Sequence, residues 1–180
     1  MKKSLYICSL AAALLLLSVP NAKAQEAEEF RKVSFAERNL GGPRLGLTFI
    51  PGGGKLSKEL EKEGIRNIVS QFGWHFEWQV VPEGGGPQFV VQFVPLVAGV
   101  EYGKFLLSTT LGLGIRLPSG IEFGLGPNLL FAGQGASTAL MATIGKTFNY
   151  SGVSIPINLV WVTNPDGNRL GIVVGYAIAD

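Results

Sequence analysis

The chain has 180 residues, of which 47% are hydrophobic and only 16% are charged, with a formal net charge of +2 and a mean hydropathy of +0.30. This length suits a single domain. Lys2, Lys3 and Lys23 lie in the first 24 positions, so the remainder carries twelve basic and thirteen acidic residues, a net charge of −1. Nucleic-acid binding needs a clustered basic surface, and this balance excludes it. Cys8 is the only cysteine, which excludes disulfides.

The first 24 residues have the three parts of a secretory signal. Two lysines are followed by an apolar stretch over residues 5–19 and then by the small-residue pattern Ala22-Lys23-Ala24. This order predicts a signal peptide over 1–24 that is cleaved after Ala24. The protein is therefore expected to be exported, and Cys8 is expected to leave with the signal.

Residues 25–43 are rich in charge and end in Gly41-Gly42-Pro43. Glycine and proline at the end of a charged segment are typical of irregular chain. We interpret 25–43 as a flexible leader and 44–180 as the folded domain.

From residue 44 onward the dominant pattern is alternation with a period of two. Over residues 68–80, Phe72, Trp74 and Phe76 fall on one face, while His75 and Glu77 fall on the other. Alternation of this kind is typical of β-strands, in which neighbouring side chains point to opposite faces. The predicted strands are 44–50, 68–80, 87–98, 104–117, 121–131, 136–150, 153–163 and 169–178.

The connections between these segments are short, except for the first. Short connections permit antiparallel neighbours but no parallel crossover. The pattern therefore predicts an all-β fold, an up-and-down antiparallel β-barrel of about eight strands. The first connection contains the charged segment 55–66, in which Leu56 and Leu60 predict a short helix. That helix is interpreted as either a solvated linker or a lid or plug.

The composition of the two faces predicts which one points outward. The polar face is mostly small or uncharged, which suits a crowded lumen, whereas a face in water would be dense in charge. The bulky aromatic face would overfill a small barrel and suits contact with lipid. The predicted lumen network contains Gln71, His75, Glu77, Gln79, Arg116 and Glu122, and the hairpin at Ser119 places Arg116 opposite Glu122.

The sequence contains little that indicates catalysis or cofactor binding. With one histidine and no cysteine after the signal, no metal site is expected. No cofactor is expected either, because the glycine-rich run before Lys55 has Leu56 where a phosphate loop needs serine or threonine. His75 and Glu77 share a face and are the weak catalytic candidates; the alternative is a hydrogen-bonded network inside the barrel.

Residues 44–178 resemble the small eight-stranded bacterial outer-membrane barrels of the outer-membrane-protein-A transmembrane-domain type. The runs 71–77 and 123–128 also look like segments of uncharacterised exported barrel proteins. This resemblance implies an outer-membrane location in a Gram-negative-type bacterium and carries no activity to transfer.

The function predicted from the sequence is a structural or interaction-type outer-membrane barrel with no identifiable catalytic activity and no open pore. Its expected partner is the lipid bilayer of the outer membrane, with protein partners unknown and nucleic acid excluded. Two alternatives remain open: a soluble exported barrel in the periplasm that binds an apolar ligand, and a lipid-modifying outer-membrane enzyme.

Overall fold

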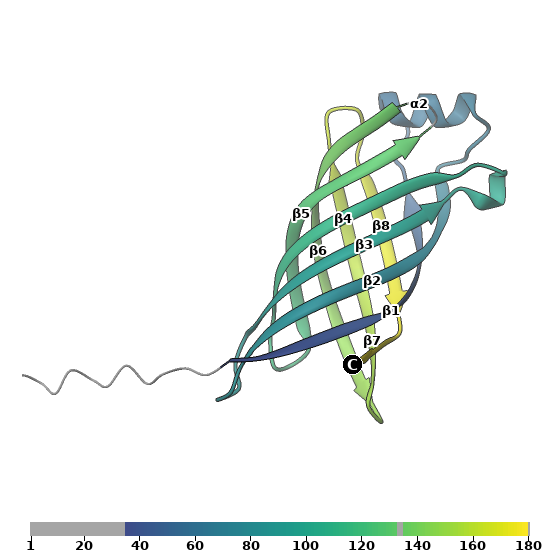
Figure 1. Cartoon of the computed structure of the whole chain (residues 1–180). Helices are drawn as coiled ribbons and strands as arrows, with labels where there is room; N and C mark the ends of the chain where they lie inside the picture. The colour runs from purple at the N-terminus through teal and green to yellow at the C-terminus, as the bar shows by residue number, and fades with distance from the viewer. Residues whose placement is uncertain (1–34, 133–134, 180) are drawn as a thin grey trace, which may run out of the picture. The chain divides into compact units, whose positions relative to one another are not determined.

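The computed structural model describes residues 35–132 and 135–179, which form a closed antiparallel barrel (Figure 1). The predicted signal peptide and residues 25–34 of the predicted leader lie outside the described residues. The strands are β1 (Phe35–Phe49), β2 (Ile68–Pro82), β3 (Gln88–Ala98), β4 (Leu106–Arg116), β5 (Ile121–Ala132), β6 (Gly135–Tyr150), β7 (Val153–Thr163), β8 (Arg169–Gly175) and β9 (Ala177–Ala179).

The barrel closes through β1. One edge of β1 pairs with β2 along its whole length, and the other edge pairs with β8 and then with β9. Both β8 and β9 also pair with β7, so they are two pieces of one strand that is interrupted at Tyr176. The described chain therefore has eight strand positions, and the predicted fold class is confirmed.

The first strand begins earlier than the sequence indicated. The leader was predicted to extend to Pro43, but β1 begins at Phe35, and this boundary was wrong. The pair Gly41-Gly42 was interpreted as a break, whereas Gly42 permits close strand packing: a Cβ there would collide with the carbonyl oxygen of Tyr176. Residues 35–43 pair with residues 74–82 of β2, from Phe35 opposite Pro82 onward. They provide the backbone partners for this edge of β2, which would otherwise be unpaired.

The connections at one end of the barrel are tight turns. Ser151 and Gly152 join β6 to β7, and both have positive φ angles, of 48° and 83°. Positive φ at both central residues is typical of the type I′ turn, whose twist matches that of the flanking strands. The β4–β5 turn is closed by hydrogen bonds from the Leu117 amide to the Ile121 carbonyl and from the Gly120 amide to the Leu117 carbonyl.

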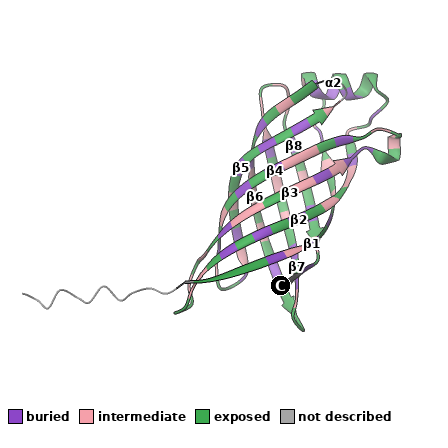
Figure 2. Cartoon of the chain, in the orientation of Figure 1, coloured by how far each residue is buried: buried purple, intermediate pink, exposed green. Residues whose placement is uncertain are grey.

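Burial alternates along much of most strands (Figure 2). On β2, Trp74 and Phe76 are 47% and 42% exposed, while His75 and Glu77 between them are 3% and 2% exposed. The predicted assignment of faces is confirmed: the bulky apolar side chains point outward and the polar ones point into the lumen.

The first connection forms the helix α2 (Lys55–Lys62), as predicted, and the β3–β4 connection contains the short 3-10 helix η1 (Val100–Tyr102). Leu56 and Leu60 lie one helical turn apart and are buried. Among the described residues, no helix combines the length and the apolar character that crossing a membrane requires.

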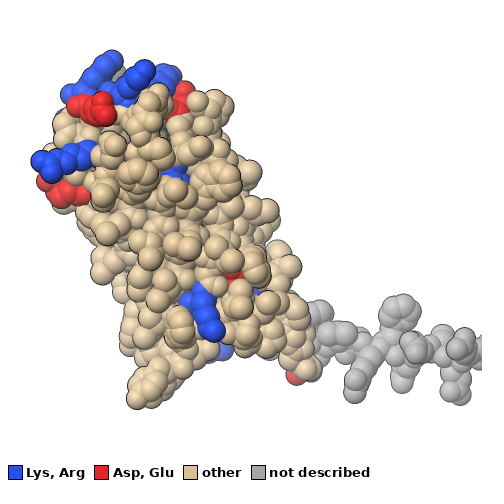
Figure 3. All heavy atoms as spheres, turned by 180° about the vertical axis from the view of Figure 1, so that it is seen from behind, with Lys and Arg blue, Asp and Glu red and all other residues tan. Residues whose placement is uncertain are grey.

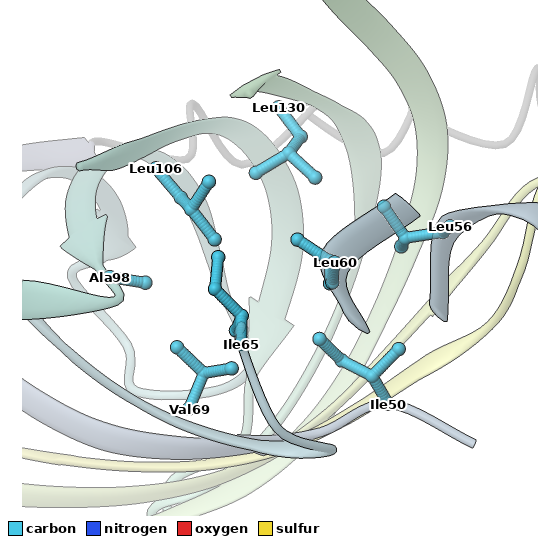
Figure 4. Close-up of a cluster of buried hydrophobic side chains, with 8 residues drawn as sticks. All are labelled: Ile50, Leu56, Leu60, Ile65, Val69, Ala98, Leu106 and Leu130. Atoms are coloured by element: carbon cyan, nitrogen blue, oxygen red, sulfur yellow. The ribbon is translucent and has the colours of Figure 1, made fainter. Parts of the chain in front are cut away.

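The buried face of α2 packs on side chains from the strand ends (Figure 4). We call this group the apolar plug; it consists of Ile50, Leu56, Leu60, Ile65, Val69, Ala98, Leu106 and Leu130. The amide of Leu56 also donates to the Asp166 carbonyl at 2.9 Å, which ties α2 to the β7–β8 connection. Of the two interpretations of segment 55–66, the structure supports the plug.

Candidate functional site

The lumen is the one region of the described barrel where charged side chains are gathered and buried. It contains a cavity of about 90 Å³, lined by residues from every side of the barrel. Alternation on β2 delivers His75, Glu77 and Gln79 to this space. Inward-facing residues of the other strands meet them there, so the site depends on closure of the barrel.

Arg116 is the hub of the lumen cluster nearest the tight turns. It is the last residue of β4, and Glu122 lies directly opposite it near the start of β5, which confirms the predicted register. The Arg116 Nε donates to Glu122 Oε2 at 2.9 Å. Across the lumen, the same guanidinium donates from Nη1 and Nη2 to Glu77 Oε1 and Oε2 at 2.5 and 2.8 Å. One arginine therefore bridges two carboxylates, with two-pronged geometry toward Glu77.

Two glutamines donate further hydrogen bonds to the carboxylates. Gln92 on β3 donates from Nε2 to Glu122 Oε1 at 2.7 Å and to Glu77 Oε2 at 3.0 Å. Gln79 donates to Glu77 Oε1. Glu77 is thus a buried carboxylate whose two oxygens both accept hydrogen bonds, as a charge in such a place requires.

His75 links this cluster to Arg44 on β1. Arg44 Nη2 lies 2.7 Å from His75 Nδ1. A guanidinium can only donate, so Nδ1 must be the acceptor, and the ring proton sits on Nε2 of a neutral imidazole. Nε2 lies 3.3 Å from Glu77 Oε2. We call Arg44, His75, Glu77, Arg116 and Glu122 the ionic network; its two cations and two carboxylates balance.

A second, smaller polar cluster lies in the half of the lumen nearer α2. Arg169, the first residue of β8, donates from Nη2 to Asn128 Oδ1 at 2.7 Å. The amide nitrogen of Asn128 in turn donates to Ser108 Oγ at 2.9 Å and to Thr110 Oγ1 at 2.8 Å. This cluster contains one cation and no carboxylate.

The structure brings together most of the residues proposed for the lumen network. His75, Glu77, Gln79, Arg116 and Glu122 are joined by the contacts described above. Gln71 also lines the lumen cavity, but among the described residues it takes no part in those hydrogen bonds.

The network predicted from the sequence did not include four of the lumen polar residues: Arg44, Gln92, Asn128 and Arg169. The signal that could have found them is the same alternation. Arg44 and Arg169, for example, stand next to the outward-facing Leu45 and Leu170.

The arrangement offers little for catalysis or metal binding. Both nitrogens of His75 are engaged, with Arg44 and Glu77, so neither is available as a base toward a substrate. No serine hydroxyl within residues 35–132 and 135–179 is hydrogen-bonded to the ring. The described part of the chain also contains no group of three histidine, cysteine or acidic side chains placed to hold a metal ion.

Comparison with known proteins yields likenesses among solved structures alone. No protein-family model matches the chain, and no curated protein matches it. The structure of Ail, the attachment invasion locus protein of Yersinia pestis, is similar over 80% of this chain and 97% of its own, at 12% identity and a TM-score of 0.46. Neisserial surface protein A is similar over 81% and 98%, at 9% identity and a TM-score of 0.46. A second Ail structure, in complex with the heparin analogue sucrose octasulfate, covers 82% and 99%, at 13% identity and a TM-score of 0.45.

Proposed function

We propose that this protein is a structural or interaction-type barrel of the bacterial outer membrane, without an open pore and with no identifiable catalytic activity. The observation that carries the proposal is that the apolar face of the barrel points outward and the polar face points inward, the reverse of a water-soluble protein. Phe72 and Trp78 on β2 are 46% and 48% exposed, and the other strands also present large apolar side chains outward. Meanwhile the carboxylates of Glu77 and Glu122 are buried inside. Such a surface suits lipid and is unfavourable in water.

The distribution of charge on the outside supports the same environment. Charged side chains gather at the end of the barrel that carries α2, and the middle of the face seen in Figure 3 is largely uncharged. Lys146 is the exception on β6, where it is exposed; its Nζ lies 5.6 Å from the centre of the Phe148 ring. Lys146 stands four residues before the end of its strand, from where a lysine can extend its ammonium group to the membrane surface.

Exposed aromatic side chains lie toward both ends of the strands. One set belongs to the end with the tight turns and the other to the end with α2. Rings at these two levels are typical of membrane barrels, where they sit at the headgroups. The sets are Trp78, Tyr150 and Tyr176, and Phe105, Phe131 and Trp161.

The lengths of the connections suggest an orientation. Bacterial membrane barrels place short turns in the periplasm and longer loops outside the cell. Here the β4–β5 and β6–β7 turns are short, whereas the opposite end carries α2 and η1. We therefore place the α2 end on the outside, where a partner would meet it.

The two alternatives have less support. A carrier of an apolar ligand needs an apolar cavity, whereas this lumen holds the ionic network and a cavity of about 90 Å³. A lipid-modifying enzyme needs an accessible base and a nucleophile, whereas His75 is 3% exposed, hydrogen-bonded to Arg44 on one side and 3.3 Å from Glu77 on the other.

Cell fractionation tests the location. We expect the protein in the outer-membrane fraction, and we expect boiled and unboiled samples to migrate differently on a gel because the barrel resists detergent when cold. Recovery in the soluble periplasmic fraction, with no heat-dependent shift, would overturn the proposal.

A pair of arginine substitutions tests contact with lipid directly. Leu125 is 58% exposed and lies near the middle of β5, whereas Tyr150 is 77% exposed at the end of β6. In lipid vesicles, Leu125→Arg should lower the free energy of unfolding by about 2–4 kcal/mol and Tyr150→Arg by about 0–1 kcal/mol. Small and equal losses, within about 0.5 kcal/mol, are the result expected of a water-exposed surface and would contradict the proposal.

Planar bilayer recordings test the absence of a pore. The ionic network and the apolar plug fill the lumen at two levels, and an eight-stranded barrel is only just wide enough for its side chains. We expect no stable single-channel currents. Their appearance in the purified protein would mean that the lumen is open.

A further inference from the structure

The charges of the lumen are distributed unevenly between its two polar clusters. In the ionic network, the cations Arg44 and Arg116 equal in number the carboxylates Glu77 and Glu122, and Arg44 itself donates to neutral groups: the His75 ring and two backbone carbonyls. The cluster nearer α2 contains Arg169 and no carboxylate. The lumen therefore holds one more cation than carboxylates, and Arg169 is the cation whose cluster contains no carboxylate.

Arg169 is buried without the partners that a buried cation needs. It is 8% exposed, and it forms none of the ion pairs found in the described chain. Its one hydrogen bond is to the neutral amide oxygen of Asn128, and its buried Nε has no protein partner among the described residues. A charge removed from water is strongly unfavourable unless it is paired, so this guanidinium calls for an anion.

The surroundings of Arg169 can accommodate one. Ser108 and Thr110 line the same cavity, and each hydroxyl accepts from Asn128, which leaves its own proton available to donate. The cavity, of about 90 Å³, is large enough to hold water and a small inorganic anion.

We propose that the lumen binds one small monovalent inorganic anion of the chloride class at Arg169. The Nε–H group of Arg169 donates to the anion, and the hydroxyls of Ser108 and Thr110 face the same space. The anion neutralises the charge of Arg169 in the cluster nearer α2, as Glu77 and Glu122 neutralise the cations of the ionic network. The site is independent of the membrane location, because it lies wholly inside the barrel.

The test is the dependence of melting temperature on chloride. The purified protein is unfolded by heat in detergent micelles at constant ionic strength, with chloride replaced stepwise by gluconate, a much bulkier organic anion. A site that binds only in the folded state raises the melting temperature by about 3–5 °C for each tenfold rise in chloride above the dissociation constant. Equal melting temperatures of the wild type in the two salts would overturn the proposal.

Two lumen variants separate this site from a general salt effect. Arg169→Met removes the cation and should abolish the chloride dependence. Asn128→Asp places a built-in carboxylate on the 2.7 Å contact with Arg169, so it should abolish the dependence and raise the melting temperature in gluconate above that of the wild type. If Arg169→Met fails to fold, the chloride dependence of Asn128→Asp alone still tests the proposal. Lys146→Met, which removes an exposed cation, should keep the full dependence; a dependence that survives in the lumen variants would overturn the proposal.

Bromide, which scatters anomalously, locates the anion directly. In crystals grown in bromide, we expect an anomalous peak within hydrogen-bond reach of Arg169 Nε. Water alone at that position, with no anomalous signal, would overturn the proposal.

Discussion

The two ends of the lumen are filled by physically different means. Toward the tight turns, Glu77, Arg116 and Glu122 are joined by directional, charge-assisted hydrogen bonds between strands. Toward α2, Leu60 and Ile65 belong to a plug held by apolar burial. Each member of the first cluster leaves a buried charge behind when it is removed, whereas the second loses stability in proportion to the volume removed. The comparison predicts that disrupting the ionic network destabilises the whole barrel, whereas disrupting the apolar plug unfolds only the region around α2.

Removal of Glu77 should have the largest effect. Glu77→Ala leaves Arg116 with one carboxylate, deprives Gln79 of an acceptor and removes the carboxylate 3.3 Å from His75. Breaking a buried pair by removing one partner typically lowers the free energy of unfolding by about 3–5 kcal/mol. Urea unfolding in detergent measures it. The exposed Glu59→Ala on α2 is the control and should stay within about 0.5 kcal/mol of wild type; a loss for Glu77→Ala as small as this would mean that water already screens the network.

Truncation of the plug should act locally. Leu60 is 5% exposed, and Leu60→Ala should destabilise the packing of α2 by about 2–5 kcal/mol through lost burial and a residual cavity. Hydrogen exchange should accelerate in the α2 amides and remain unchanged in the strands. Lys58→Ala, on the exposed face of α2, is the matched control. Equal acceleration in the strands would show that the plug and the barrel unfold as one unit.

Replacement of His75 distinguishes a network role from a catalytic one. His75→Ala leaves Arg44 Nη2 without its acceptor, and a lost partner of this kind costs about 1–3 kcal/mol. His75→Gln, which keeps an acceptor and a donor, should lose less. Lipid-modification assays are run in parallel with thermal unfolding. Wild-type activity that vanishes in a His75→Ala protein of unchanged stability would establish the catalytic alternative.

The smallest effect is expected at the exposed pair between Glu63 and Lys104, which ties the segment after α2 to the β3–β4 connection. Lys104 Nζ donates a hydrogen bond to Glu63 Oε2 at 2.6 Å. This hydrogen bond, and secondly the positive charge of Lys104, hold the pKa of the Glu63 carboxyl below its ordinary value of 4.5. A carboxyl with a lowered pKa in the folded state stabilises that state above the unfolded pKa and ceases to do so as the pH falls through the folded one. Hydrogen exchange at the end of α2 should therefore be slower in wild type than in Glu63→Gln at pH 7. The difference should shrink as the pH falls below 4.5 and vanish once the pH is below the lowered pKa of Glu63; a difference that remains when Glu63 is fully protonated would exclude the ion pair as its cause.

The prediction from sequence succeeded where neighbours along the chain decide the outcome. The alternation around His75 and Glu77 correctly predicted which side chains enter the lumen, and the short turn at Ser119 correctly placed Arg116 opposite Glu122. It failed for residues 35–43, because Gly41-Gly42-Pro43 has the composition of a break and becomes a strand only when paired with β2.

By itself, the sequence determined the period of two, the opposed faces and the positions of the tight turns, because side chains in an extended chain must alternate and glycine adopts the turn conformations. Only the tertiary structure decided the contacts across the lumen. Arg116 meets Glu77, 39 positions away, because closure through β1 and the stagger of the strands set both at one level. Because the barrel closes, Leu60 of α2 packs against side chains from several strand ends. Arg169 likewise faces Asn128 rather than a carboxylate. Distances across a closed barrel depend on strand number and register together, and no local run of residues encodes either.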